Sequence, residues 1–371
     1  MVYATSDGSA GKRLRVGMVG GGRNAFIGAV HRLAMRLDDQ IVLVAGALSS
    51  DPENAAASAA EIGIAPERSY ADYHAMALAE AGRPDGIEAV VIVTPNHLHA
   101  PIATAFLEAG IDVICDKPLS TTLSDAEALV TLARAKKRRF VVTLNNTGYA
   151  MVRQAREMVM AGELGRIVSV HGAYIQDWLT KPIDAEGQKQ AEWRTDPARA
   201  GQSAVLADIG VHAFNLASYI SGCEAEAVSA DLFTAVPGRR LDDNAHVMVR
   251  WADGARGTIL ASQTSPGHYN DCPCASMATK PGSNGRAGGR RNCASRAMAR
   301  KPARWCAAAM VRPKKAGASR ACRRRIRKAI SRPSPISTAT PPTSSARIAP
   351  VAWSMPRARH RCRMLSTARA A

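Results

Sequence analysis

The last 100 residues of this 371-residue chain contain no aspartate, glutamate, phenylalanine or tyrosine. Residues 272–371 carry 24 Lys and Arg, whereas residues 1–271 carry 25 of them against 31 Asp and Glu. The whole formal charge of +18 therefore arises in the tail. Because a segment with so much like charge and so few large apolar side chains cannot offset its ordering entropy, we expect residues 272–371 to be disordered.

Long apolar runs are also absent. No stretch of about 18 apolar residues that might span a membrane is present, and residues 1–12 lack the apolar core of a secretory signal. Only Cys115 and Cys223 lie before residue 272, which is typical of a reducing compartment. We expect a cytoplasmic protein without a membrane span and with a disordered N-terminus over residues 1–12.

Short apolar runs alternate with helical patterns between residues 13 and 145. Strands are predicted over residues 14–19, 41–48, 89–94, 112–115 and 140–144. A first helix is predicted after the glycine cluster and ends near residue 37, and further helices are predicted over residues 52–62, 101–109 and 124–135. Apolar strands spaced by helices indicate a parallel sheet covered on both faces. The pattern predicts an α/β fold whose first part, residues 13–145, is a doubly wound Rossmann domain.

The pattern changes after residue 145. A long alternating run over residues 167–178 is followed by a helix over 204–220 and by strand-like runs over 225–236, 246–251 and 257–263. These runs predict a second domain of α+β type over residues 146–271, with an open and mostly antiparallel sheet.

The first predicted strand leads into a glycine turn. Gly20, Gly22 and Ala25 match the pattern G-x-G-x-x-G/A at a strand-to-helix turn. In this pattern the first glycine permits the tight turn, the second admits a pyrophosphate, and the third small residue packs the helix against the strand. We expect a dinucleotide to bind here, with Arg23 and Asn24 contributing from the same turn.

The end of the second strand usually selects between the two nicotinamide cofactors. An acidic residue there binds the ribose 2′-hydroxyl and repels a 2′-phosphate. Ser49 occupies that place, and Asp51 is predicted to cap the helix that begins at Pro52. No arginine stands next to Ser49, so both NAD and NADP remain open.

Three polar stretches carry the candidate chemistry: T-P-N-H-L-H over residues 94–99, D-K-P over 116–118, and D-I-G-V-H over 208–212 with Trp193-Arg194 upstream. Ligands bind at the carboxyl ends of strands in open α/β sheets, so the first two stretches follow strands at the expected place. Taken singly, each has a structural alternative: a turn, a solvated lysine, or an i,i+4 pair on a helix. No cysteine cluster or H-E-x-x-H motif accompanies the histidines, so no metal is expected.

Together these motifs resemble the Gfo/Idh/MocA family (glucose–fructose oxidoreductase, inositol dehydrogenase, rhizopine catabolism) over residues 14–271. The resemblance implies an NAD(P)-dependent dehydrogenase that acts on a CH–OH group of a sugar or an inositol-like polyol. It implies that His212 is the general base that takes the proton of the reacting hydroxyl. It implies that Lys117 holds and polarises the oxygen of this hydroxyl, and that Asp208 orients and binds the substrate. It also places Trp193 and Arg194 in the substrate pocket.

The resemblance further implies a set of cofactor contacts and a homo-oligomer assembled through the second sheet. The expected cofactor contacts beyond the glycine turn are Ser49, Thr94, Pro95, Asn96, His99, Asp116 and Asn145. Two positions depart from the family pattern. Asp116 replaces the usual glutamate, which shortens its reach, and residues 145–149 read N-N-T-G-Y in a loop where many relatives carry Tyr and Arg.

After residue 271 the chain no longer follows the family, which continues with another strand and a closing helix. The reading frame can be shifted so that each new codon begins at the third base of the present codon, with that base left open wherever the present residue does not fix it. In this frame the codons for residues 271–285 can encode LPLRVYGDQAGLEW, and those for residues 325–340 can encode HPEGYLEAFANIYRD. These ordered matches in one frame lead to the hypothesis that the tail is frame-shifted. The second sheet would then end near Gln263 with an unpaired edge, so we expect poor solubility, little or no activity and loss of the oligomer that the family assembles through this sheet.

Other functional classes stay open as alternatives. The basic run over residues 323–328 is compatible with sequence-unspecific nucleic-acid binding through counterion release, although we expect no specific nucleic-acid partner. A non-catalytic relative that senses NAD is a further alternative, and the presence of Lys117, Asp208 and His212 argues against it. A catalytically dead frame-shifted product is a third.

The frameshift hypothesis makes a prediction about the gene. We expect sequencing across codons 265–345 to show one base gained or lost near codon 272 relative to close relatives. A DNA sequence with no insertion or deletion at this place would contradict the hypothesis.

Overall fold

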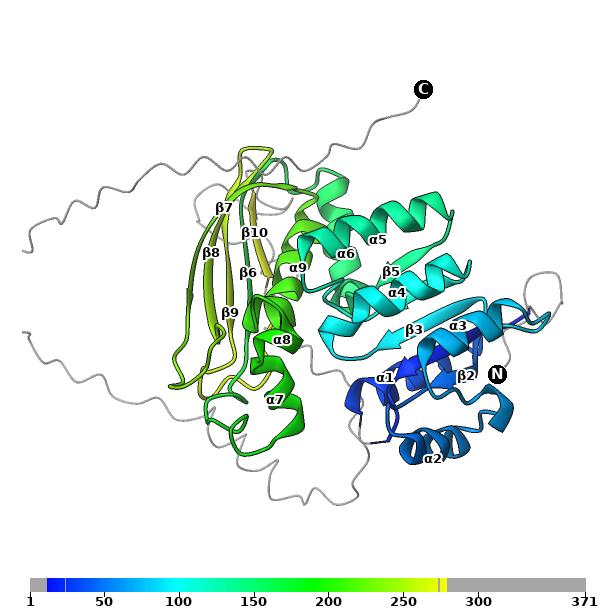
Figure 1. Cartoon of the computed structure of the whole chain (residues 1–371). Helices are drawn as coiled ribbons and strands as arrows, with labels where there is room; N and C mark the ends of the chain where they lie inside the picture. The colour runs from blue at the N-terminus through cyan, green and yellow to red at the C-terminus, as the bar shows by residue number, and fades with distance from the viewer. Residues whose placement is uncertain (1–11, 24, 273, 279–371) are drawn as a thin grey trace, which may run out of the picture. The chain divides into compact units, whose positions relative to one another are not determined.

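The first sheet of the computed structural model is parallel and has the strand order β2-β1-β3-β4-β5 (Figure 1). The structure describes residues 12–23, 25–272 and 274–278, so the expectations for residues 1–11, for Asn24 and for most of the tail lie outside the described residues. All five residues of β3 are buried, as expected for a central strand with helices on both faces. The predicted doubly wound domain is confirmed.

The elements of this domain alternate along the chain as the apolar pattern predicts, with α3 as an addition. They are β1 (Leu14–Gly20), α1 (Phe26–Met35), β2 (Ile41–Ala47), α2 (Pro52–Ile62), α3 (Tyr73–Ala81), β3 (Ala89–Val93), α4 (His99–Glu108), β4 (Asp112–Cys115), α5 (Leu123–Ala135) and β5 (Phe140–Val142).

Local capping explains where several of these helices begin and end. The Asp51 side chain accepts a hydrogen bond from the backbone N–H of Asn54 at 2.7 Å, and Pro52 occupies the first helical position of α2. The helix ends at Gly63, whose φ of 85° suits glycine. At the start of α5, Thr122 accepts from the N–H of Asp125. The predicted cap at Asp51 is thus confirmed.

The second sheet has the order β10-β6-β9-β8-β7, and of these neighbours only β6 and β9 run parallel within the described residues. The prediction of a mostly antiparallel open sheet is confirmed. Its elements are α6 (Ala150–Met160), β6 (Ile167–Ile175), α7 (Lys189–Thr195), α8 (Pro197–Ala200), α9 (Val211–Ser221), β7 (Ala225–Phe233), β8 (Asn244–Trp251), β9 (Arg256–Ser262) and β10 (Cys274–Ala278).

The second sheet extends beyond the point expected from composition. Strand β10 pairs with β6 in antiparallel fashion, with Cys274 opposite Gly172. The expectation that the sheet ends near Gln263 is therefore wrong, and so is the expectation of disorder for residues 274–278. Pairing with a strand about 100 residues earlier is a non-local interaction, which local composition does not report.

Helix α9 packs closely against one face of this sheet (Figure 1). A Cβ atom built on Gly172 of β6 would lie 2.8 Å from the backbone oxygen of Ala213, so only glycine permits this approach. The core beneath includes Trp251 and Val170, neither of them exposed. This packing fixes the helix that carries His212.

The glycine turn differs from expectation in one residue. Gly20 and Gly21 adopt φ values of 80° and 75°, which favour glycine. A Cβ built on Gly28, inside α1, would lie 2.4 Å from the Cα of Gly21. The close approach of helix and turn that was expected of Ala25 is therefore made by Gly28, while Ala25 precedes the helix and donates its N–H to the Gly22 oxygen.

We expect Gly28→Ala to lower the free energy of unfolding by about 1–3 kcal/mol, because the new methyl group forces α1 away from the turn. Gly148→Ala is the matched control, since a Cβ there meets nothing within 4 Å. Thermal unfolding of both variants tests this. Equal effects of the two substitutions would contradict the proposed close packing.

Candidate functional site

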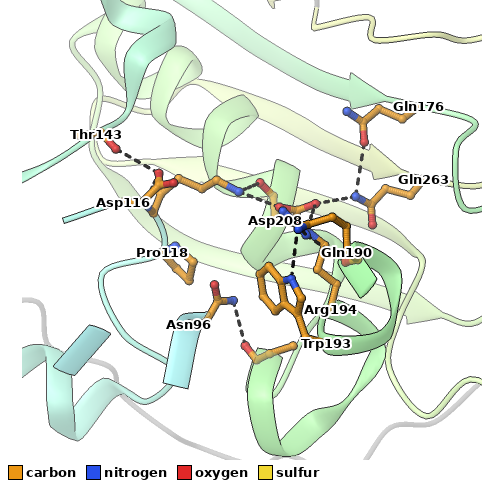
Figure 2. Close-up of polar contacts among 12 residues, drawn as sticks. Asn96, Asp116, Pro118, Thr143, Gln176, Gln190, Trp193, Arg194, Asp208 and Gln263 are labelled. Atoms are coloured by element: carbon orange, nitrogen blue, oxygen red, sulfur yellow. Dashed lines mark hydrogen bonds and ion pairs between the residues drawn. The ribbon is translucent and has the colours of Figure 1, made fainter. Parts of the chain in front are cut away.

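An ion pair between the two sheets forms the centre of the candidate site (Figure 2). Lys117 follows β4, and its Nζ lies 2.7 Å from Oδ1 of Asp208 and donates to the backbone oxygen of Asp208 at 2.6 Å. The two side chains are only 16% and 15% exposed. Solvent screening is weak at such exposure, so each charge depends on the other.

Asp208 lies in a turn of π-helix, Leu206–Gly210, that directly precedes α9. Its end is marked by the N–H of Val211, which donates to the oxygen of Leu206 five residues earlier. The predicted helix over residues 204–220 is confirmed, but it begins with this π-helical turn and becomes α-helical only from Val211. Such wide turns are frequent at functional sites, and this one presents both the side chain and the carbonyl of Asp208 to Lys117.

The second oxygen of Asp208 is bound as well. Gln263 donates its Nε2–H to Oδ2 at 2.7 Å, and the Arg194 Nε lies 3.3 Å from the same atom. Burial opposes ionisation of Asp208, but the charges of Lys117 and Arg194 and the hydrogen bonds from Lys117 and Gln263 outweigh it. The pKa of Asp208 is therefore held well below its usual range, and the side chain is a carboxylate.

Arg194 is held by aromatic rings on α7 and on the loop after β6. Its guanidinium lies 4.2 Å from the ring centre of Trp193 and 5.9 Å from that of Trp178. Its Nη1 donates to the backbone oxygen and the side-chain oxygen of Gln190. Of the two predicted substrate residues, Arg194 thus contacts Asp208, and Trp193 packs against the guanidinium of Arg194. Trp178, Gln190 and Gln263 were missed, because no motif marks them.

His212 lies in the first turn of α9 and is 8% exposed. Its Nδ1 has no hydrogen-bond partner among the described residues. Burial, followed by the charge of Lys117, lowers its pKa to about 4, against opposing effects of Asp208 and Asp116. At neutral pH the ring is therefore an uncharged imidazole that can accept a proton.

Asp116 and His99 organise the ends of β3 and β4. Oδ1 of Asp116 accepts from the N–H of Lys117 at 2.8 Å and from Thr143 Oγ1 at 3.0 Å. The two ring nitrogens of His99 lie 2.7 Å from the Pro118 oxygen and 3.0 Å from the Thr94 oxygen. With 1% exposure, His99 braces the two strand ends against each other and keeps no ring nitrogen free for a cofactor.

The glycine turn approaches the end of β2 closely at Gly22. A Cβ built on Gly22 would lie 2.8 Å from the Leu48 oxygen and 2.9 Å from the Ser58 Oγ, so no side chain fits at this position. At the end of β3, Thr94 Oγ1 and His97 Nδ1 are buried without a hydrogen-bond partner among the described residues. Buried polar atoms are normally paired, so these atoms are suited to meet a polar ligand.

The other expected cofactor residues are distributed around this turn. Ser49 Oγ accepts from the N–H of Asp51 and from Asn54, both at 3.1 Å. Arg23 donates its N–H to Ser58, and its guanidinium pairs with Glu61 at 2.8 Å.

Two further residues follow strand ends. Asn96 is buried and donates to the Ala200 oxygen at 3.2 Å, and Pro95 precedes it at the start of a short 3₁₀ turn. Asn145 is exposed and begins another such turn after β5.

The described part of the chain holds no group of three His, Cys, Asp or Glu side chains arranged to bind a metal ion. None of its helices is long and apolar enough to cross a membrane.

Two family models match successive parts of the chain. The model for the NAD-binding Rossmann fold of an oxidoreductase family matches residues 14–155, and the model for the GFO/IDH/MocA C-terminal domain matches residues 152–281. Both segments coincide with the two sheets described above. The second match continues past residue 271, in agreement with the pairing of β10.

Relatives match over about two thirds of their own length. An uncharacterized oxidoreductase of Bacillus subtilis is 37% identical over 69% of this chain and 66% of its own length. A levoglucosan dehydrogenase of Pseudarthrobacter phenanthrenivorans is 33% identical over 70% of each chain. The crystal structure of an inositol dehydrogenase homolog from Azotobacter vinelandii, complexed with NAD⁺, is 36% identical, with a TM-score of 0.70 over 72% of this chain and 69% of that one.

The low pKa of His212 predicts a dependence of stability on pH. In the unfolded chain His212 binds a proton near pH 6.5, whereas in the folded chain it binds this proton only near pH 4. Stability therefore falls as the pH is lowered through this window, by about 3 kcal/mol for a difference of this size. We expect His212→Asn to flatten the fall, and His246→Asn, at an exposed position of β8, to retain it. Urea unfolding at several pH values measures both, and equal slopes in both variants would contradict the assignment.

Proposed function

This chain belongs to the Gfo/Idh/MocA family of oxidoreductases, and we propose from this premise that it transfers a hydride between a nicotinamide cofactor and a sugar or polyol. The reacting group is a hydroxyl in one direction and a carbonyl in the other. The observation that carries the proposal is the buried Lys117–Asp208 pair beside the neutral ring of His212. The names of the levoglucosan and inositol dehydrogenase relatives support the substrate class.

The charges of the site favour an uncharged, hydroxyl-rich substrate. Lys117 and Arg194 both contact the carboxylate of Asp208, and Asp116 lies close enough to influence His212. The two cations, Lys117 and Arg194, are therefore balanced by the two carboxylates, Asp208 and Asp116. No positive charge is left over to bind a phosphate or carboxylate group of a substrate. A polyol offers donors and acceptors without charge, and Trp193 adds an apolar ring at the edge of the site.

The glycine turn and the ends of β3 and β4 are the parts of the chain that would hold the cofactor. Gly20 and Gly22 would admit the pyrophosphate, and Thr94, Asn96 and Asp116 would line the nicotinamide end. The bound cofactor supplies the hydride acceptor or donor. The chain does not select between NAD and NADP at the ribose 2′ position, because Ser49 has no charge that would repel the 2′-phosphate of NADP.

The side chains divide the proton chemistry among them. The neutral His212 accepts the proton of the substrate hydroxyl as the hydride leaves the carbon. The Lys117 ammonium donates a hydrogen bond to the same oxygen and stabilises the negative charge that develops there. Asp208 holds the ammonium at 2.7 Å and contributes an acceptor for the substrate. The reverse reaction uses the same groups with His212 protonated.

We also propose that a second copy of the chain covers the outer face of the second sheet. Met248 and Phe233 lie on this face and are 63% and 43% exposed. Apolar side chains grouped on an open sheet are typical of an association surface. The proposed location is the cytoplasm, since Cys115 and Cys223 are free and buried. The frameshift hypothesis concerns residues 272–371, of which the structure describes only 272 and 274–278, and it stays a prediction.

Lys117→Ala tests the proposed chemistry directly. We expect kcat for polyol oxidation to fall by about 10²–10³, because the substrate oxygen loses its cationic hydrogen-bond donor. Lys136→Ala, at an exposed lysine, is the matched control and is expected to keep wild-type activity. Activity is followed through NADH or NADPH absorbance. Binding of the dinucleotide without turnover on any sugar or polyol would instead favour the non-catalytic, NAD-sensing alternative.

A further inference from the structure

A chain of side-chain amides extends from the carboxylate of Asp208, on the side opposite Asp116 in Figure 2. Gln263 donates from Nε2 to Oδ2 of Asp208 at 2.7 Å and to Oε1 of Gln176 at 3.3 Å. Gln176 donates in turn to Oδ1 of Asn270 at 2.7 Å. Three amides thus stand in series behind the carboxylate that binds Lys117.

The position of Gln263 is set by the backbone. It follows β9 directly, its N–H donates to the Asp243 oxygen at 3.1 Å, and its own oxygen accepts from the N–H of Leu179 at 3.0 Å. The residue is 1% exposed. Gln176 follows the neighbouring strand β6, and its N–H donates to the Ser262 oxygen at 2.8 Å. Parallel pairing of β6 with β9 therefore brings the two amides together.

The orientation of the Gln263 amide follows from its partners. Both acceptors, Oδ2 of Asp208 and Oε1 of Gln176, require the Nε2 group, so a flipped amide would place oxygen against oxygen twice. The amide consequently presents a hydrogen-bond donor to Asp208 at all times. A carboxylate of such low exposure needs donors of this kind to remain ionised.

We propose that Gln263 is a positioning residue that keeps Asp208 ionised and its Oδ1 turned toward Lys117, with Gln176 holding Gln263 in the donor orientation. Because Oδ2 is bound by Gln263, the carboxylate cannot rotate without losing that bond. The Lys117 ammonium is then retained in one place for the substrate oxygen. The inference rests on the proposed function of the same site.

Gln263→Glu is the sharpest test, because it changes the donor and almost nothing of the shape. At about pH 8 the new carboxylate is ionised and repels Asp208, so we expect kcat to fall at least about tenfold. At about pH 5.5 one proton is shared by the two carboxyl groups, and the introduced side chain, when protonated, donates to Oδ2 in place of the amide. Acid conditions should therefore restore much of the activity, while His212 is still neutral.

Gln154→Glu adds the same charge at an exposed position of α6 and serves as the matched control. We expect it to follow the wild-type pH profile. A loss in Gln263→Glu that is the same at both pH values indicates a merely structural role and overturns the proposal. Full activity of Gln263→Glu at about pH 8 overturns it as well.

Thermal unfolding supplies a readout that needs no turnover. We expect Gln263→Glu to lower the Tm at about pH 8, and the addition of Asp208→Asn to restore part of the loss, because an amide at position 208 can donate to a carboxylate at position 263. Additive losses in the double variant would overturn the proposal. If the wild-type chain shows no dehydrogenase activity, the proposed function fails, and the unfolding experiment still decides the role of Gln263.

Discussion

The Lys117 ammonium bound between the carboxylate and the backbone carbonyl of Asp208 is the interaction on which the rest of the site depends. Because both side chains are largely shielded from water, neither charge is tolerable without the other. The pair therefore holds the end of β4 against the π-helical turn before α9. Its cation also adds to burial in keeping His212 neutral, so the same contact sets both geometry and protonation.

Polar groups around this pair fall into two kinds. Some already have partners in the chain: His99 contacts two backbone oxygens, and Asp208 contacts three side chains. Others are buried without a partner among the described residues, namely Thr94 Oγ1 and the Nδ1 atoms of His97 and His212. The first kind makes the site rigid, and the second leaves polar capacity for a ligand. This division is the pattern expected of a preorganised binding site.

Local signals predicted much of the fold and the residues of the site. Apolar strands, helix caps and the glycine turn act over a few residues, so the doubly wound sheet and the cap at Asp51 followed from them. Local signals failed where the deciding contact is distant. The packing of Gly28 on Gly21 and the pairing of β10 with β6 both depend on backbone approach in space.

The sequence by itself determined the two domains, the glycine turn and the motifs that contain Lys117, Asp208 and His212, because each is a pattern of neighbouring residues. Only the tertiary structure decided that Lys117 meets Asp208 across 91 residues of chain, and that Gln263 binds the other oxygen of that carboxylate. The physical reason is that charge pairing and pKa depend on burial and distance between side chains. The burial of the side chains and the distances between them are set by how the two sheets and α9 pack, and no single motif encodes this packing.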